Sequence, residues 1–172
     1  MRLKRKLHEL EEVFKKSKIQ ILGLSEVRRP FETLLTTKNN NILFHSYSKG
    51  GQKGIGYIIK QELKDSITEI EAISDHIGKL VLELSTNERL VIVQVYAPRS
   101  NATEDEIENF YKELEKTIDT YTYKRKHQLT IMGDFNSQVG QKRNREHKYL
   151  GNYCYGQCNE KGQRLLDFCQ EH

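Results

Sequence analysis

Two residues with chemically active side chains, Asp134 and Asn136, follow a short apolar segment in the last third of the chain. Residues 129–132 are typical of a strand in the middle of a sheet, and Gly133 ends it. Because side chains alternate along an extended backbone, we expect Asp134 and Asn136 to project to one side while Phe135 points to the core. Oxygen ligands held by a rigid strand end suit a hard cation or a phosphate group. The same residue types also form turns, so a plain turn is an equal alternative.

Two further strand ends carry polar side chains. Glu26 comes just after residues 19–24 (IQILGL), which are typical of a strand that is buried on both faces. Tyr96 follows residues 90–95 (LVIVQV), although a tyrosine at a strand end is by itself more often a packing residue than a catalytic one. If their strands are near neighbours in one sheet, Glu26 and Asp134 can approach each other.

Helices and strands alternate along the chain, which predicts an α/β fold. Apolar residues at helical spacing predict a helix over residues 2–16, and Thr103 with Glu106 fits a capping box that begins a second helix. Asn159 is expected to cap a last helix. Short apolar runs predict the strands, and two of them form a β-hairpin across the polar turn 85–89. The expected strands are residues 19–24, 42–47, 54–60, 66–73, 77–84, 90–95 and 129–132.

Length and composition restrict the class of protein. The chain has 172 residues, of which 36% are hydrophobic and 30% are charged, so we expect one soluble globular domain over residues 1–172. No apolar run approaches the length that crosses a membrane, and the basic N-terminus is followed by acidic residues rather than by the apolar part of a signal peptide. Three cysteines without an export signal indicate reduced thiols. The expected location is nuclear or cytoplasmic, not secreted.

Positive charge is unevenly distributed, although the net charge is only +4. An acidic stretch covers residues 104–119, so one face of the molecule is able to bind a polyanion. Ordinary solvated surface charge is the alternative for any single basic cluster. The basic clusters are residues 2–6, 15–18, 28–29, 124–126 and 142–148.

The motifs SEVR, VYAP and MGDFN occur in this order and resemble the successive motifs of the endonuclease/exonuclease/phosphatase family, whose fold is shared by DNase I, exonuclease III and apurinic endonucleases. The chain looks closest to the endonuclease domains of non-long-terminal-repeat retrotransposons and their derivatives, including craniofacial development protein 2-like sequences. The segments that carry this likeness span nearly the whole chain: ILGLSEVR, GIGYIIK, VIVQVYAP, TIMGDFNSQVG and NEKGQRLLDFC. The resemblance implies an incomplete DNase I-like four-layer sandwich, in which two packed mixed β-sheets have helices outside.

The resemblance also implies roles for the polar strand ends in Mg²⁺-dependent phosphodiester hydrolysis, with Mn²⁺ as a substitute cofactor. Glu26 looks like the Mg²⁺ ligand, and Asp134 looks like the group that orients or deprotonates the attacking water. Asn136 looks like its phosphate-facing partner, and Tyr96 looks like a contact to the scissile phosphate. A hard cation prefers carboxylate oxygen and lowers the pKa of bound water, which agrees with these roles. The expected partner is DNA, whose backbone the basic residues Arg28, Lys142, Arg143 and Arg145 are expected to contact.

The sequence departs from the family pattern at both ends, so we expect a truncated domain with uncovered sheet edges and poor stability. The family's first strand with its Asn is absent, and so are its last strands with an Asp and a Ser-Asp-His motif. His76 follows Asp75 but precedes the hairpin, so this pair is interpreted as a surface turn. Loss of a transition-state partner costs several orders of magnitude in rate. The chain is therefore expected to be either an impaired Mg²⁺-dependent endonuclease or a non-catalytic remnant that still binds nucleic acid.

Overall fold

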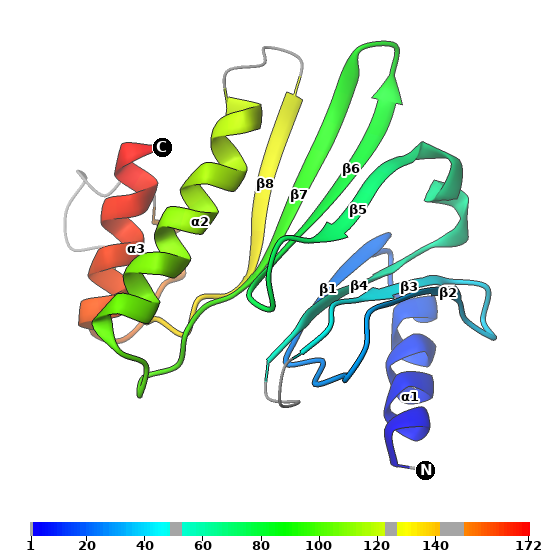
Figure 1. Cartoon of the computed structure of the whole chain (residues 1–172), viewed down its shortest axis with the longest axis horizontal. Coiled ribbons are helices and arrows are strands. Elements are labelled where there is room, and N and C mark those ends of the chain that lie inside the picture. The colour runs from blue at the N-terminus through cyan, green and yellow to red at the C-terminus, as the bar shows by residue number, and fades with distance from the viewer. Residues whose placement is uncertain (1, 49–52, 123–126, 142–149) are drawn as a thin grey trace.

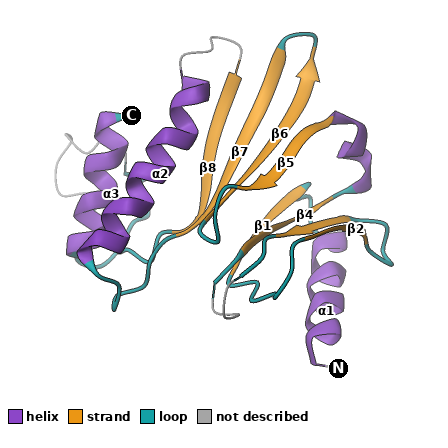
Figure 2. Ribbon diagram, in the orientation of Figure 1, coloured by secondary structure: helices purple, strands orange, loops and turns teal. Residues whose placement is uncertain are grey.

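The protein folds into two four-stranded β-sheets that pack against each other, with helices on both outer sides (Figures 1 and 2). The structure is a computed structural model and describes residues 2–48, 53–122, 127–141 and 150–172. This arrangement confirms the expected α/β class with two packed sheets.

The first sheet has the strand order β1-β4-β3-β2, and each of its pairings is antiparallel. Its two inner strands, β4 and β3, are completely buried. The expected first strand, β1, packs on both faces, but it lies at the edge of the sheet and is only half-buried. The strands are β1 (Ile21–Ser25), β2 (Thr33–Thr36), β3 (Ile42–His45) and β4 (Ile55–Ile59).

The second sheet has the order β5-β6-β7-β8, and it is mixed because β7 and β8 run parallel while the other pairs are antiparallel. The expected hairpin is confirmed as β6 and β7, which pair along most of their length. A short 3₁₀-helix, η2, leads from the first sheet into the second. The elements are η2 (Gln61–Ser66), β5 (Ile67–Ala72), β6 (Ile77–Ser85), β7 (Glu88–Tyr96) and β8 (His127–Asp134).

Three helices cover the sheets, and both expected helix caps are present. Thr103 and Glu106 form the reciprocal bonds of a capping box, with the Thr103 backbone N–H donating to the Glu106 carboxylate at 2.8 Å. The Asn159 side chain accepts from the Gly162 backbone N–H at 2.7 Å and starts the last helix. The helices are α1 (Arg2–Lys16), α2 (Glu104–Thr122) and α3 (Glu160–Glu171). None of the helices among the described residues is both long and apolar enough to cross a membrane.

Three apolar clusters hold the layers together, so the order is helix, sheet, sheet, helix (Figure 1). Alternate residues of β7 serve two of these clusters: Val93 and Val95 face α2, while Ile92 and Tyr96 face the other sheet. The cluster between α1 and the first sheet contains Phe14, Leu43 and Ile58; that between the sheets contains Phe44, Tyr57, Leu80, Ile92 and Tyr96; the outer one contains Val93, Val95, Phe110, Leu114 and Phe168.

One strand, β2, was not expected from the sequence. Its four residues (TLLT) are largely exposed, with Leu34 at 59% and Leu35 at 43% exposure, so they show no buried alternation. Pairing with β3 alone makes the segment a strand, because Leu34 lies opposite Phe44 and Leu35 opposite Leu43.

Candidate functional site

Three strand ends meet at one edge of the sandwich, although β1 lies in the first sheet and β7 and β8 lie in the second, not in one sheet as the sequence-based expectation required. In the parallel pair, Tyr96 at the end of β7 lies opposite Asp134 at the end of β8, so the two side chains share the face toward the other sheet. The end of β1 reaches the same place, because the Gln94 side-chain amide donates to the Ser25 hydroxyl at 3.1 Å. Glu26 follows Ser25 directly and is thereby brought to the end of β7.

The Glu26 carboxylate is the centre of this site. The Tyr96 hydroxyl donates to Glu26 Oε1 at 2.6 Å, although the two residues are 70 positions apart in the chain. Arg99 donates to the same oxygen through its guanidinium and also to the Tyr96 hydroxyl through Nε at 2.7 Å. Arg28 donates to the other oxygen, Oε2. Both oxygens of Glu26 are therefore engaged by donors from the chain.

These donors keep Glu26 ionised. The hydrogen bond from Tyr96 and that from Arg99 lower the pKa of Glu26 from 4.5 to about 2, against a smaller opposing effect of burial. The pKa of Tyr96 is raised, first by burial and then by its bond to Glu26. The site thus presents a carboxylate anion next to a neutral phenol over the whole physiological pH range.

The backbone at the site has an unusual conformation. Glu26, Arg28 and Asn136 have φ angles of 56°, 55° and 47°, which non-glycine residues seldom adopt. Two backbone bonds hold the first two residues in place, since Val27 N–H donates to the Gly54 carbonyl at 3.1 Å and Arg28 N–H donates to that of Lys53 at 2.9 Å. Backbone strain that the surrounding structure maintains occurs preferentially at functional sites.

The segment after β8 forms a hydrogen-bonded turn that faces the site. Asp134 Oδ1 accepts from the Asn136 backbone N–H at 2.8 Å, which is the bonding pattern of an Asx turn. The Asn136 side-chain amide donates to the Ala97 carbonyl at 2.7 Å, and this bond ties the turn to the end of β7. Phe135 packs on the opposite side, against the outer core cluster, as expected. These residues therefore form a turn, and the turn lies beside the end of β7; the expected cation or phosphate site stays a prediction.

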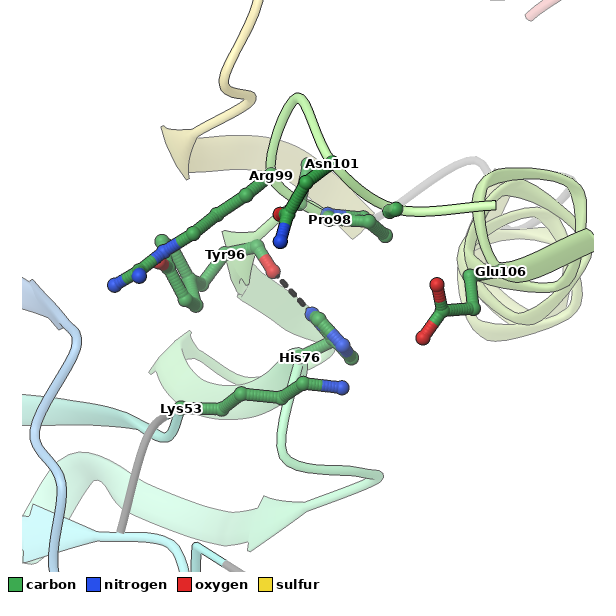
Figure 3. A pocket seen from close by; sticks show the side chains of 9 residues that line it. Lys53, His76, Tyr96, Pro98, Arg99, Asn101 and Glu106 are labelled. Atoms are coloured by element: carbon green, nitrogen blue, oxygen red, sulfur yellow. Dashed lines mark hydrogen bonds between the residues drawn. The ribbon is translucent and has the colours of Figure 1, made fainter. Parts of the chain in front are cut away.

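Tyr96 also lines a pocket of about 210 Å³, which the sequence did not indicate (Figure 3). His76 lies in this pocket, where Nδ1 donates to the Tyr96 carbonyl and the ring stacks on that of Tyr96 at 6.2 Å. Asp75 and His76 lie in the turn between β5 and β6, as expected, but the half-buried His76 also packs against Tyr96, which the sequence did not indicate. Lys53 and Glu106 project toward the same space from a loop and from α2 (Figure 3).

The hairpin register explains why His76 lies there. Ile77 at the start of β6 pairs with Val95 near the end of β7, so the residue before Ile77 must lie beside Tyr96. The expected hairpin of residues 77–84 and 90–95 already contained this information, because antiparallel pairing brings the start of one arm to the end of the other. Arg99 had no comparable signal, since only the fold of its loop turns it toward Glu26.

The residues present fit a divalent cation only in part. Among the described residues, no three His, Cys, Asp or Glu side chains are grouped so that they could hold a metal ion. An ionised carboxylate such as Glu26 is nevertheless the ligand type that Mg²⁺ uses when water and a phosphate oxygen complete its coordination. Arg28 and Arg99 would have to leave Glu26, and their side chains are 52% and 48% exposed, so burial does not restrain them.

The candidate nucleic-acid contacts are only partly described by the structure. Arg28 lies at the site but contacts Glu26. Lys142, Arg143 and Arg145 lie outside the described residues.

Comparison with known proteins finds a distant likeness. No protein-family model matches the chain. The chain is 26% identical over 167 residues to craniofacial development protein 2 of Tragulus javanicus, and 25% identical over 167 residues to that of Bos taurus. Each alignment covers 97% of this chain but only 28% and 27% of the respective relative, so the chain spans little more than a quarter of their length. The chain is therefore a distant homologue of craniofacial development protein 2 over most of its own length.

Proposed function

We propose that the strand-end site binds the phosphodiester backbone of nucleic acid and hydrolyses it with the help of a divalent cation. The hydrogen bond between the Tyr96 hydroxyl and Glu26 carries this proposal, because it joins two of the three family-like motifs at one point. The third motif, MGDFN, lies beside the VYAP motif because Tyr96 pairs with Asp134 across β7 and β8. The distant homology to craniofacial development protein 2 agrees with this, as does the resemblance of the motifs to DNase I-like endonucleases, whose sandwich has the same order of layers.

Each residue then has a defined task. Glu26 would hold the cation, which would supply charge neutralisation at the phosphate and a lower pKa for bound water. Asp134 accepts a hydrogen bond from the attacking water and orients it, while Asn136 stays fixed by its bond to the Ala97 carbonyl. The Tyr96 hydroxyl, released from Glu26, donates to a phosphate oxygen.

The two arginines complete this scheme. Arg28 and Arg99 neutralise Glu26 in the free protein, where each donates to one of its oxygens. With Glu26 holding a cation, both guanidinium groups would be available to the phosphate, for which their planar geometry is suited. The same positive groups support the second candidate function, binding of nucleic acid without hydrolysis, because a phosphate can replace Glu26 as their partner.

Nicking of supercoiled plasmid distinguishes the two functions. Purified chain with Mg²⁺ is expected to convert the plasmid to its open form, and Asp134→Asn is expected to lower the rate on the order of 10²-fold. Asp65→Asn, at an exposed position in η2, is the matched control and should nick like the wild type. Equal nicking by the wild type and Asp134→Asn would identify a contaminating nuclease and refute the hydrolytic role.

Binding is measured on the same samples without Mg²⁺. Salt-dependent retention of DNA by a folded chain that does not nick would support the non-catalytic function. Absence of both binding and nicking at low salt would refute both.

A further inference from the structure

A larger pocket of about 710 Å³ lies between α1 and the edge strand β2, on the outer side of the first sheet. Its apolar lining includes Leu7 from α1, Leu35 from β2 and Leu43 from β3, while Phe31 stands near its edge with 54% exposure. Pockets that enclose small ligands commonly measure about 300–1,000 Å³ and are mostly apolar with few polar groups. This pocket has that size and character, and it shares no lining residue with the strand-end site around Glu26 and Tyr96.

One polar group inside the pocket lacks a partner. His45 is only 3% exposed and lines the pocket, and its Nδ1 has no hydrogen-bond partner within the part of the chain that the structure describes. An unpaired polar atom in such a buried side chain is destabilising, so it indicates that something else satisfies it. Burial is the main cause that lowers the pKa of His45, and the charge of Arg29 adds to it, against smaller opposing effects of backbone hydrogen bonds to Ser46 and Phe31 and of the charge of Glu32.

The charges at the pocket favour an anionic ligand. Arg29 and Lys38 both line it, whereas Glu32, whose charge acts on the pKa of His45 in the opposite sense to that of Arg29, is not among the lining residues. The one carboxylate in the lining, Glu11, already accepts hydrogen bonds from the Thr37 hydroxyl and from the Asn41 side chain at 3.1 Å. An acidic group on a ligand would therefore meet two cations and an imidazole N–H, with the nearby acid already occupied.

We propose that this pocket binds an apolar carboxylic acid, whose carboxylate accepts from His45 Nδ1–H and pairs with Arg29 while its body lies against Leu35 and Leu43. The inference is independent of the proposed nuclease function, because it uses none of the residues of the strand-end site. It also explains why an apolar residue such as Leu35 is exposed on an edge strand beside an open pocket.

Titration with 2-naphthoate tests the proposal on the full chain. The protein contains no tryptophan, so naphthoate fluorescence reports binding directly when it is excited at a wavelength longer than the tyrosine absorption band. We expect saturable binding, and we expect the uncharged isostere 2-naphthamide to bind about tenfold more weakly because it forms no ion pair. The His45 ring nitrogens should shift in long-range ¹H–¹⁵N spectra during the naphthoate titration.

A matched pair of variants locates the ligand. Leu34 and Leu35 are neighbours on β2 with similar exposure, but only Leu35 lines the pocket, since side chains alternate along a strand. Leu35→Gln and Arg29→Gln are each expected to weaken 2-naphthoate binding about tenfold, whereas Leu34→Gln should leave it unchanged.

Three results would overturn the proposal: no saturable binding, equal binding of naphthoate and naphthamide, or equal losses in the two leucine variants. The last result would indicate adsorption to the exposed surface of β2 rather than to the pocket. Circular dichroism melts of all variants show whether they are folded, which is expected because the substituted leucines are largely exposed.

Discussion

Replacing Glu26 by glutamine should cost stability at neutral pH and not in acid. The substitution removes the negative charge that accepts from Tyr96, Arg99 and Arg28 but keeps the shape of the side chain. The fall in the pKa of Glu26 from 4.5 to about 2 would correspond to about 3 kcal/mol for a carboxylate shielded from water. Because 37% of the side chain is exposed, solvent screening reduces the expected loss to about 1 kcal/mol.

The sign of the pH dependence follows from the direction of that pKa change. A carboxyl group whose pKa is lower in the folded state stabilises the fold above its unfolded pKa, near 4.5 here. The stabilisation disappears as the pH falls through the folded pKa of about 2, because protonated Glu26 resembles glutamine. The wild type and Glu26→Gln should therefore differ by about 1 kcal/mol at neutral pH and become equal near pH 2.

Urea denaturation followed by circular dichroism measures this difference at several pH values. Glu83→Gln, at an exposed position on β6, controls for the general effect of removing one acidic residue. A Glu26→Gln variant as stable as the wild type at neutral pH would refute the inferred contacts. A difference that persists unchanged near pH 2 would show that charge is not its cause.

Three other substitutions test the architecture around the site, each by urea denaturation. Gly133→Ala should lower the free energy of unfolding by about 3 kcal/mol or prevent folding, because a Cβ there would lie 2.0 Å from the Val95 carbonyl oxygen and the φ of Gly133 is +138°. Gly151→Ala is the control and should be neutral, since nothing lies within 4 Å of a Cβ at that position. Asn159→Ala should cost about 1 kcal/mol through loss of the α3 cap, and an unchanged midpoint would show that the cap is dispensable. Tyr57→Phe should cost about 1–3 kcal/mol, because the buried hydroxyl contacts three backbone groups; an equal or higher stability would mean that those groups find other partners.

The regular elements with a clear local pattern were predictable. The helix starts at Thr103 and Asn159 follow from capping chemistry, and the β6–β7 hairpin follows from two apolar runs across a polar turn. The β2 strand was not predictable, because a short exposed edge segment has no buried face and its pairing with β3 depends on tertiary contacts. The half-buried state of β1 was also missed, since apolar content alone does not show that a strand lies at a sheet edge.

The candidate site shows the same division. The sequence by itself placed polar side chains at three strand ends, because a glycine, an acid or a tyrosine after an apolar run is visible locally. Only the tertiary structure decided that these ends meet and that Arg28 and Arg99 form ion pairs with Glu26. The order of strands that are distant in the sequence arises from packing between them, and periodicity within one segment carries no information about that order.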